Sequence, residues 1–419
     1  MKYGLIGEKL GHSFSKEIHE KIADYKYELK EIAKGDLEDF ILSKSYNAIN
    51  VTIPYKEMVI PYMDYIDEKA LEIKAVNTII NKNGKLYAYN TDYYGLKALI
   101  VSNNIDCYDK NVLILGTGGT SKTAKSVLND LKAKSILFLS RSNKDNNPNI
   151  ITYEEAKEIK DVNIIVNTSP NGMYPKDEEP LIDISVYKNL EAVVDVVYNP
   201  LKTRLVRNAL SLGVKAVGGL YMLVAQAVYA VNKFLDRDLE EAQTLNIIDK
   251  VYNDILSKKQ NIVLIGMPGC GKTTIGKMLI DALDKEFIDS DGEIEKVINC
   301  QIKDFLTESN EDDFRDIESN VINNISLLNN KIISTGGGVV KRESNIKSLR
   351  ANGVIIFIDR DINNIKTDDS RPLSSNVEKL KKLYIDRYPL YKKASDYIVS
   401  NNDSIDECLK EILEIIKGE

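Results

Sequence analysis

The 419-residue sequence is poor in histidine and cysteine. Its two histidines, His12 and His19, lie near the N-terminus, so acid-base chemistry later in the chain has to use Lys, Asp, Glu or Tyr. The four cysteines are far apart and form no CxxC pair, which excludes the usual zinc-site spacing and favours a reducing compartment. Ten prolines and 23 glycines are too few for a fibrous or low-complexity chain, so we expect a globular protein.

The sequence also lacks long apolar runs and an excess of positive charge. No window approaches the length of a membrane span, and the apolar stretch before Glu8 is far too short for a secretory signal. We therefore expect a cytoplasmic protein with no membrane partner. The formal net charge is −7, and the parts on either side of Ser257 are both mildly acidic, so nucleic acid is not an expected ligand. Nothing in the sequence indicates the oligomeric state.

The length is sufficient for two to four domains, and β-branched runs alternate with helical-period stretches throughout. This alternation is typical of βαβ units and predicts an α/β protein with parallel sheets. The strand candidates fall into three blocks: Tyr3–Ile6, Tyr25–Leu29, Asn47–Ile53 and Thr78–Ile80; Val112–Leu115, Ser135–Leu139, Asn163–Val166, Ala192–Val197 and Val214–Val217; Ile262–Ile265, Glu286–Ile288, Lys331–Ser334, Val354–Ile358 and Tyr397–Val399.

Two helices are predicted between the second and third blocks. Tyr221–Phe234 is apolar on most faces and should pack back against another domain, whereas Asp236–Ile255 is more amphipathic. A polar stretch at 256–261 then suggests a linker. We predict one domain over 1–257, in which 1–99 and about 220–256 bind substrate and 100–219 bind a cofactor, and a second domain over 258–419.

The second block contains the pattern of a dinucleotide site. The strand Val112–Leu115 runs into Gly116, Gly118 and Gly119 and then into a helix, as in a Rossmann phosphate site. The third position of the GxGxxG pattern is Ser121, which departs from the usual Gly or Ala. Taken alone, the motif is equally compatible with an ordinary strand-to-helix turn.

The end of the next strand bears on the choice of cofactor. Ser140, Arg141 and Ser142 stand where an NAD-binding domain usually carries an acidic residue, and an arginine with hydroxyls suits the 2′-phosphate of NADP(H). The alternative is a solvated basic turn. The loops at 167–169 and 197–200 follow later strands at the same expected edge and are cofactor or substrate candidates.

The first block carries polar groups suited to a small polyhydroxylated ligand. Across residues 1–257, eight motifs occur in the order found in the shikimate dehydrogenase family, which this region resembles: GHSFS, NVTIPYK, AVNT, NTD, GTGGTSKTA, NTSPNGM, VVYNP and GGLYMLVAQA. The resemblance implies reduction of 3-dehydroshikimate to shikimate with NADPH. It implies Lys56 and Asp92 as the catalytic pair, and it adds Gly219 to the cofactor site. It also implies a set of substrate-binding residues: Ser13, Ser15, Asn50, Thr52, Asn77, Tyr198 and Gln226. From the residues alone, Ser15 could instead be a helix N-cap.

The third block contains a P-loop. Residues 266–273 fit GxxxxGK(S/T) between a predicted strand and a predicted helix, which is the context that the motif requires. Its backbone amides and Lys272 would hold the phosphates of ATP, and the Thr273 hydroxyl would coordinate Mg²⁺. The predicted nucleotide-binding residues are Gly266, Gly269, Cys270, Gly271, Lys272, Thr273 and Thr274. Redox control through Cys270 is a weaker hypothesis than a small residue tolerated in the loop.

The other motifs of residues 258–419 resemble those of shikimate kinase, namely FIDSD, FRDIE, STGGG, DSRPL and RYPLY. The resemblance implies that shikimate is bound by Asp291, Arg315, Gly337 and Arg387. It also implies that Asp289 acts near Mg²⁺ and the attacking hydroxyl, and that Arg371 closes over the transferring phosphoryl group.

The sequence therefore predicts a bifunctional enzyme that makes shikimate and then phosphorylates it. Two alternatives remain. One half could be a catalytically silent ligand-binding module that regulates the other, or the dehydrogenase could act on quinate or a related hydroxy acid.

Overall fold

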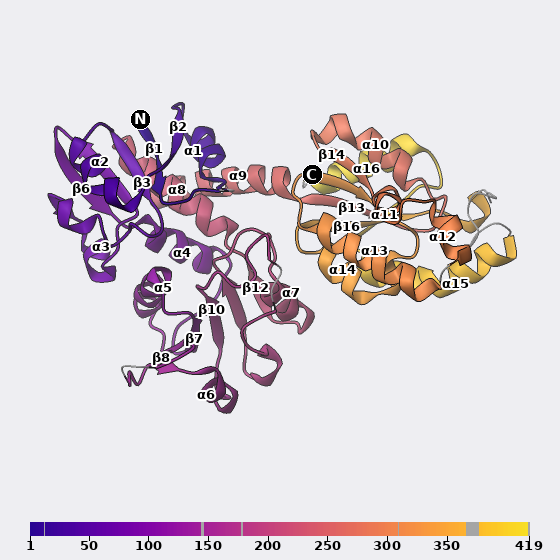
Figure 1. Ribbon diagram of the computed structural model, residues 1–419, viewed down its shortest axis with the longest axis horizontal. Helices are drawn as coiled ribbons and strands as arrows, with labels where there is room; N and C mark the ends of the chain where they lie inside the picture. Colours follow the sequence, from indigo (N-terminus) through magenta and orange to yellow (C-terminus); the bar gives the residue numbers. More distant parts are fainter. Residues whose placement is uncertain (12, 144–145, 177–178, 309, 366–376, 418–419) are drawn as a thin grey trace. The chain divides into compact units, whose positions relative to one another are not determined.

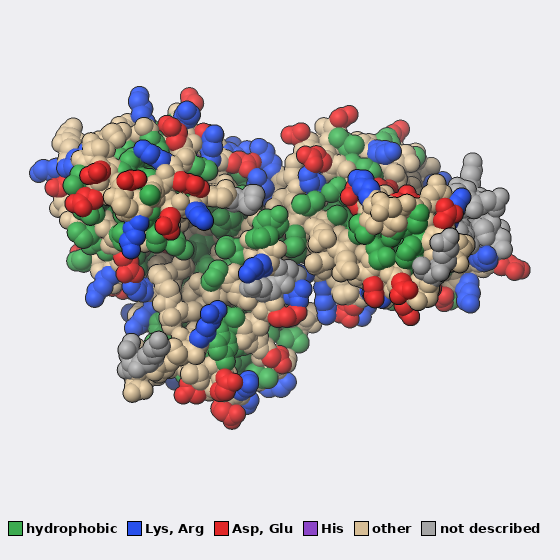
Figure 2. All heavy atoms as spheres, viewed as in Figure 1, with side chains coloured by type: hydrophobic (Ala, Val, Ile, Leu, Met, Phe, Trp, Pro, Cys, Tyr) green, Lys and Arg blue, Asp and Glu red, His purple; other side chains and the backbone are tan. Residues whose placement is uncertain are grey.

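The computed structural model describes residues 1–11, 13–143, 146–176, 179–308, 310–365 and 377–417. The chain divides into two compact units, Met1–Ile255 and Leu256–Glu419. No helix within these ranges is long and apolar enough to cross a bilayer. On the visible face, Lys and Arg side chains are interspersed with Asp and Glu (Figure 2).

The first unit begins with a six-stranded sheet in the order β2-β1-β3-β5-β6-β4 (Figure 1). Its strands are β1 (Tyr3–Gly7), β2 (Tyr27–Glu31), β3 (Ala48–Val51), β4 (Tyr65–Ile66), β5 (Thr78–Lys82) and β6 (Lys85–Tyr89). Successive residues face opposite sides of a strand. Leu5 therefore joins the apolar layer that contains Phe234 of helix α8 (Leu220–Phe234), whereas Ile6 joins a second layer with Ile41 of helix α2 (Leu37–Ser43). The sheet thus has a hydrophobic core on each face.

The predicted parallel arrangement is wrong for part of this sheet. Strands β5 and β6 form an antiparallel hairpin, and β5 is also antiparallel to β3. The reversal occurs at Asn83 and Gly84, whose φ angles of 54° and 80° are both left-handed. Asn-Gly favours a two-residue hairpin because both residues tolerate positive φ, so this dipeptide was the signal for the hairpin.

Helices flank the first sheet and connect it to the rest of the unit. They are α1 (Ser15–Ile22), α2 (Leu37–Ser43), α3 (Glu68–Ile73), α4 (Thr91–Ser102) and α8 (Leu220–Phe234). Helix α8 packs closely on α4, where a Cβ on Gly95 would lie 2.7 Å from the backbone oxygen of Met222. It also contacts α1 and β5, so the apolar helix predicted near 221–234 returns to the first sheet, as expected.

The second sheet of this unit is entirely parallel and has the order β9-β8-β7-β10-β11-β12. This is the strand order of a Rossmann fold, with the change of direction between β7 and β10. The strands are β7 (Asn111–Leu115), β8 (Ser135–Leu139), β9 (Ile150–Ile151), β10 (Ile164–Asn167), β11 (Ala192–Asp195) and β12 (Lys215–Val217). The accompanying helices are α5 (Gly119–Asp130), α6 (Tyr153–Glu158) and α7 (Arg204–Ser211).

The stretch predicted as a polar linker is regular structure. Helix α9 spans Glu241–Lys259, and strand β13 spans Asn261–Ile265. Asn261 is fully buried, where it donates to the backbone oxygen of Leu328 and accepts from the backbone N–H of Lys331. The polarity of 256–261 therefore reflects a helix end and a buried amide that joins strands, not an unstructured connection.

The second unit contains a parallel five-stranded sheet in the order β14-β15-β13-β16-β17. Its strands are β13 (Asn261–Ile265), β14 (Glu286–Asp289), β15 (Lys331–Ser334), β16 (Gly353–Asp359) and β17 (Tyr397–Ser400). Its helices are α10 (Lys272–Leu283), α11 (Ser290–Ile298), α12 (Ile302–Glu308), α13 (Glu311–Ser326), α14 (Glu343–Leu349), α15 (Val377–Ala394) and α16 (Ile405–Lys417). The central strand β13 is buried on both faces, which explains its continuous apolar run.

Candidate functional sites

The first unit brings Lys56 and Asp92 together. The Lys56 ammonium lies 2.6 Å from the Asp92 carboxylate, and the two side chains are only 22% and 12% exposed. Lys56 lies on the loop after β3, where its backbone oxygen accepts from Val76 N–H. Asp92 occupies the first turn of α4, which Asn90 caps by accepting a hydrogen bond from Tyr93 N–H. Two loops and a capped helix thus form a partly shielded ion pair.

Amide side chains lie on elements next to this pair. Asn77 donates to the Gln226 side chain at 3.1 Å, which links the start of β5 to α8. The other end of Asn77 accepts from the backbone N–H of Thr91 at 2.7 Å. Asn50 is buried, accepts from Tyr27 and donates to Thr78 and to the backbone oxygen of Asn77. Tyr27, Thr78 and Thr91 were not predicted, because distant elements supply these partners.

The remaining predicted substrate residues lie at the starts of helices and ends of strands. Ser13 donates to the Ser15 hydroxyl at 3.0 Å and accepts from Ser15 N–H. Ser15 is the first residue of α1 and follows the N-cap position, so the alternative that Ser15 is the N-cap is wrong. The centroid of the Tyr198 ring lies 5.3 Å from that of Phe14, the residue between Ser13 and Ser15. Thr52 directly follows β3, and a Cβ added to Gly7 would lie 2.7 Å from the Thr52 methyl group.

The glycine loop between β7 and α5 has the geometry expected of a dinucleotide site. Gly116 has a φ of 103°, which disfavours other residues, and Gly118 is the N-cap of α5. Ser121 is buried, and its hydroxyl donates to the Gly118 backbone oxygen at 2.6 Å. A serine is therefore accommodated at the third motif position. Gly219 caps α8, and any Cβ there would lie 2.1 Å from the Val196 backbone oxygen.

The segment after β8 presents its basic side chain to solvent. Arg141 and Ser142 are exposed and Ser140 is half-buried. Asn143 fixes the segment by donating to the backbone oxygens of Asn147 and Ile150. In the part of the chain that the structure describes, Arg141 makes no hydrogen bond or ion pair. Its guanidinium is therefore available for a phosphate.

A buried carboxylate supports the loops at the same edge of the Rossmann sheet. Asp195 accepts from Thr203 at 2.6 Å, from Asn167 at 2.9 Å and from the backbone N–H of Val197 at 3.0 Å. Burial raises the pKa of Asp195 to about 6, although these hydrogen bonds act to lower it. Asp195 thus holds the loops after β10 and β11 together, and ionisation of its buried carboxyl costs free energy.

The raised pKa of Asp195 predicts a pH-dependent local stability. The folded Asp195 carboxyl keeps its proton to a higher pH than the unfolded one. Its contribution to the free energy of unfolding is therefore fully present below about pH 4. That contribution is lost as the pH rises through about 6, a decrease of about 3 kcal/mol. Hydrogen exchange of the β10 and β11 amides, corrected for intrinsic rates, should show this loss in the wild-type chain and a flat profile in Asp195→Asn. Parallel pH profiles for the two proteins would contradict the prediction.

The second unit contains the P-loop between β13 and α10. Gly266, Gly269 and Gly271 have φ angles of 148°, 81° and 107°, so each requires glycine. Lys272 is buried, and its ammonium donates to the backbone oxygens of Gly266 and Met267 at 2.9 and 3.0 Å. The lysine therefore curls over the loop that would hold the phosphates.

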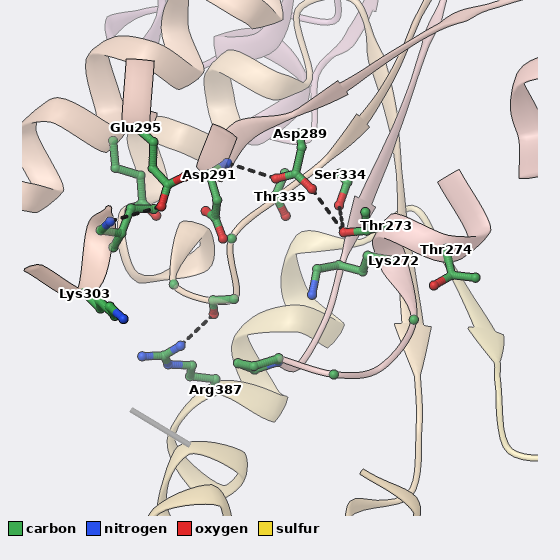
Figure 3. A pocket seen from close by; sticks show the side chains of 18 of the residues that line it. Lys272, Thr273, Thr274, Asp289, Asp291, Glu295, Lys303, Ser334, Thr335 and Arg387 are labelled. Carbon is green, nitrogen blue, oxygen red and sulfur yellow. Dashed lines mark hydrogen bonds between the residues drawn. The ribbon is translucent and has the colours of Figure 1, made fainter. Parts of the chain in front are cut away.

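Oxygen donors meet beside the P-loop and fit Mg²⁺ (Figure 3). The Thr273 hydroxyl donates to Asp289 at 3.1 Å and lies 3.3 Å from the Ser334 hydroxyl. Mg²⁺ prefers such hard oxygen ligands and usually keeps phosphates and waters as well. Asp289 and Ser334 end the strands β14 and β15, so parallel pairing brings them to one edge. Ser334 was not predicted, although its position at a strand end was a usable signal.

A cavity of about 850 Å³ adjoins these groups, and it is lined by the predicted shikimate-binding residues Asp291, Arg315, Gly337 and Arg387. Arg315 donates to Glu318 at 2.8 Å and to Glu311 at 3.0 Å. Arg387 donates to the Gly337 backbone oxygen at 2.8 Å. Partial desolvation in the cavity wall, together with the charge of Asp289, raises the pKa of Asp291 to about 6, although part of the residue is exposed.

Two predicted residues need separate comment. Arg371 lies outside the described residues. Cys270 is fully buried, and its backbone oxygen accepts from Asn401 at 2.7 Å. Burial of the thiol does not favour the redox hypothesis, because oxidation requires access to the sulfur. Thr274 follows Thr273 in the first turn of α10 and also lines the cavity.

The fold and the two sites define a chain with two enzyme halves, a dinucleotide-dependent dehydrogenase and a P-loop kinase of the small-metabolite type. Family models agree with this division. The model for the shikimate dehydrogenase substrate binding domain matches residues 5–79, and the shikimate kinase model matches residues 268–417.

Individual relatives cover each half almost completely. A shikimate dehydrogenase (NADP(+)) from Clostridium perfringens is 38% identical over 265 residues, which are 59% of this chain and 97% of that protein. A shikimate kinase from Clostridium botulinum is 48% identical over 162 residues, 38% of this chain and 98% of the relative. Among solved structures, shikimate dehydrogenase 1 from Peptoclostridium difficile has a TM-score of 0.56 and 37% identity, covering 61% of this chain and 98% of that one.

The chain therefore belongs to the shikimate dehydrogenase family in its N-terminal part and to the shikimate kinase family in its C-terminal part. It is a bifunctional shikimate-pathway enzyme that uses NADP(H) and ATP with Mg²⁺. The predicted family resemblances, fold class and cofactors are confirmed, and a silent regulatory half is not favoured.

Proposed function

We propose that residues 1–257 reduce 3-dehydroshikimate to shikimate and that residues 258–419 phosphorylate the shikimate so formed. Within the first part, residues 1–99 and about 220–256 bind substrate and 100–219 bind NADP(H). The observation that carries the first activity is the shielded pair of Lys56 and Asp92, 2.6 Å apart. The P-loop cradle beside Thr273 and Asp289 carries the second.

The dehydrogenase needs a proton donor beside the ketone. Bound NADPH supplies the hydride, and the ketone oxygen then gains negative charge. The Lys56 ammonium can give that oxygen a proton as the charge develops. Asp92 keeps the ammonium in place and accepts a hydrogen bond from the neighbouring substrate hydroxyl. Asn77 and Gln226 would contact the ring hydroxyls, and Ser13 and Ser15 the carboxylate, with Thr52 and Tyr198 closing the site.

The kinase needs to hold two anions and bring a hydroxyl to the phosphoryl group. Lys272 and the P-loop amides would bind the phosphates, and Thr273 and Asp289 would hold the metal ion. Bound Mg²⁺ neutralises charge on the phosphates. Asp289 would also lie near the attacking 3-hydroxyl, and Asp291 would accept a hydrogen bond from the substrate. Arg315 and Arg387 would bind the carboxylate, and Arg371 would stabilise the transferring group.

Separate assays of the full chain distinguish this function from the alternatives. Shikimate with NADP⁺ should be oxidised, and shikimate with ATP and Mg²⁺ should give shikimate 3-phosphate. Quinate should be a poor substrate in both. Oxidation of quinate in preference to shikimate would favour the hydroxy-acid alternative, and absence of either shikimate reaction would contradict the bifunctional assignment.

Arg141 predicts the preference for NADPH. Substituting Arg141→Ala should lower kcat/KM for NADPH by about 10- to 100-fold, because a charge-assisted bond to the 2′-phosphate is lost. The value for NADH should stay within about twofold, since NADH lacks that phosphate. Lys134, a basic residue before β8, provides a matched control as Lys134→Ala. NADH that is superior in the wild-type chain would overturn the prediction.

We also propose that the enzyme acts in the cytoplasm on small molecules, without nucleic acid or membrane partners. The mildly acidic composition and the unpaired cysteines support this proposal.

A further inference from the structure

The basic side chains that line the kinase cavity differ in whether protein groups already bond to them. Five described residues that line it are basic: Lys272, Lys303, Arg315, Arg360 and Arg387. Lys272, Arg315 and Arg387 are each bonded to protein acceptors. Lys303 and Arg360 make no hydrogen bond or ion pair within the ranges that the structure describes. These two positive charges are therefore uncompensated at the cavity wall.

Lys303 and Arg360 lie on different elements of the kinase unit. Arg360 directly follows β16, which pairs with β13 on the side away from β14 and β15. Lys303 lies on α12, which packs against α11 and α13. Helix α11 carries Asp291, and α13 carries Arg315. Lys303 thus belongs to the end of the cavity that carries the predicted shikimate-binding residues, here called the acceptor end because shikimate would accept the phosphoryl group there.

Helix α12 is anchored so that Lys303 faces the cavity. The backbone N–H of Ile302 donates to the Glu295 carboxylate at 3.1 Å, which fixes the start of the helix to α11. Ile302, Phe305 and Leu306 pack against the hydrophobic core of the unit. Figure 3 shows the Lys303 ammonium pointing into the cavity, on the side where the Arg387 guanidinium lies. Because the helix is anchored, ligand binding has to order only the Lys303 side chain and not the backbone that carries it.

At the acceptor end, protein carboxylates already neutralise part of the positive charge that a substrate carboxylate would need. Both terminal nitrogens of Arg315 are bonded to carboxylates, from Glu318 and Glu311. A substrate carboxylate placed there meets a guanidinium whose charge is already balanced. Arg387 donates one nitrogen to Gly337 and has others to offer. Lys303 is a further uncompensated cation at this end, and a charge-assisted hydrogen bond from it would strengthen the binding of an anion.

We propose that Lys303 is a shikimate-binding residue of the kinase site, which binds the substrate carboxylate together with Arg315 and Arg387. The inference rests on the proposed phosphorylation of shikimate. Because Lys303 would contact the carboxylate and not the reacting hydroxyl, it strengthens ground-state binding and leaves the chemical step unchanged. It also makes recognition depend on ionic strength.

The test compares shikimate with shikimamide, in which a neutral amide replaces the carboxylate. In Lys303→Gln, the KM for shikimate should rise about tenfold, while kcat and the KM for ATP stay within about twofold. The preference of the wild-type kinase for shikimate over shikimamide should fall about tenfold in this variant, and Lys303→Arg should restore most of it. The KM for shikimate should also rise more steeply with salt concentration in the wild-type kinase than in Lys303→Gln.

The matched control is Lys296→Gln, because Lys296 is exposed on α11 and pairs with Glu293 outside the cavity lining. This control should behave as wild type. An unchanged KM for shikimate in Lys303→Gln would overturn the inference, as would an equal loss with both substrates, which indicates a structural effect. A wild-type chain that phosphorylates neither compound would instead refute the proposed function.

Discussion

Replacing Lys56 with alanine should lower the turnover of 3-dehydroshikimate reduction by about 10²- to 10⁴-fold, the usual contribution of a positioned proton donor. The side chain is 22% exposed and bonded to Asp92, so solvent water cannot readily take over the donation. NADPH oxidation by the full chain measures the effect. Phosphorylation of added shikimate by the same preparation should be unchanged.

Two further variants separate proton donation from loss of the ion pair. Lys56→Gln can still donate a hydrogen bond to Asp92, but its amide N–H is not acidic enough to transfer a proton, so it should be impaired almost as strongly as Lys56→Ala. Lys85→Ala removes an exposed lysine from β6 and should leave the rate unchanged. A Lys56→Gln enzyme with near-normal turnover would refute the assignment of Lys56 as the proton donor.

Replacing Lys272 with alanine should reduce kinase kcat/KM by about 10²- to 10³-fold. The ammonium lies over the P-loop, bonded to Gly266 and Met267, where it would meet the charge of the transferring phosphoryl group. A coupled ADP-release assay with shikimate measures the loss. Reduction of 3-dehydroshikimate provides the internal control, because Lys272 belongs to the other compact unit.

The control for helix α10 is Lys277→Ala, since Lys277 is exposed on the same helix. Its kinase activity should remain within about twofold of the wild type. Lys272→Arg should stay strongly impaired, because a planar guanidinium cannot occupy the compact position between two loop carbonyls. Near-normal ATP turnover in either Lys272 variant would show that the loop does not bind the reacting phosphates as proposed.

Features set by short stretches of sequence could be predicted. The P-loop places its glycines at positive φ and its lysine next to them, all within eight residues. The Rossmann strand β7 and its glycine turn are equally local. In the kinase sheet, the parallel pairing of β14 with β15 places Asp289 opposite Ser334 at one edge. In each of these cases the backbone conformation follows from glycine placement and apolar periodicity.

Features that depend on distant partners could not be predicted. Asn50 and Asn77 were candidates, but their partners Tyr27, Thr91 and Gln226 come from separate elements. A polar residue in a motif does not reveal which of its atoms the protein itself already uses. Lys303 had no local pattern at all, because only the packing of α12 against α11 and α13 brings it to the cavity.

Polarity alone was misleading between the two compact units. The stretch 256–261 contains few apolar residues, yet it completes α9 and begins β13. Its lysines are tolerated because the last turn of a helix favours positive charge, and Asn261 is tolerated because buried backbone groups satisfy its amide. A polar run is therefore compatible with regular structure when each polar group has a partner.

The most direct test of the two-step assignment follows one molecule through both sites. The full chain is given 3-dehydroshikimate, ATP, Mg²⁺ and NADPH deuterated at both C4 positions, and the products are examined by mass spectrometry. The account predicts shikimate 3-phosphate that carries one deuterium on the ring. Accumulation of deuterated shikimate without phosphate, or of a phosphorylated product without deuterium, would contradict it.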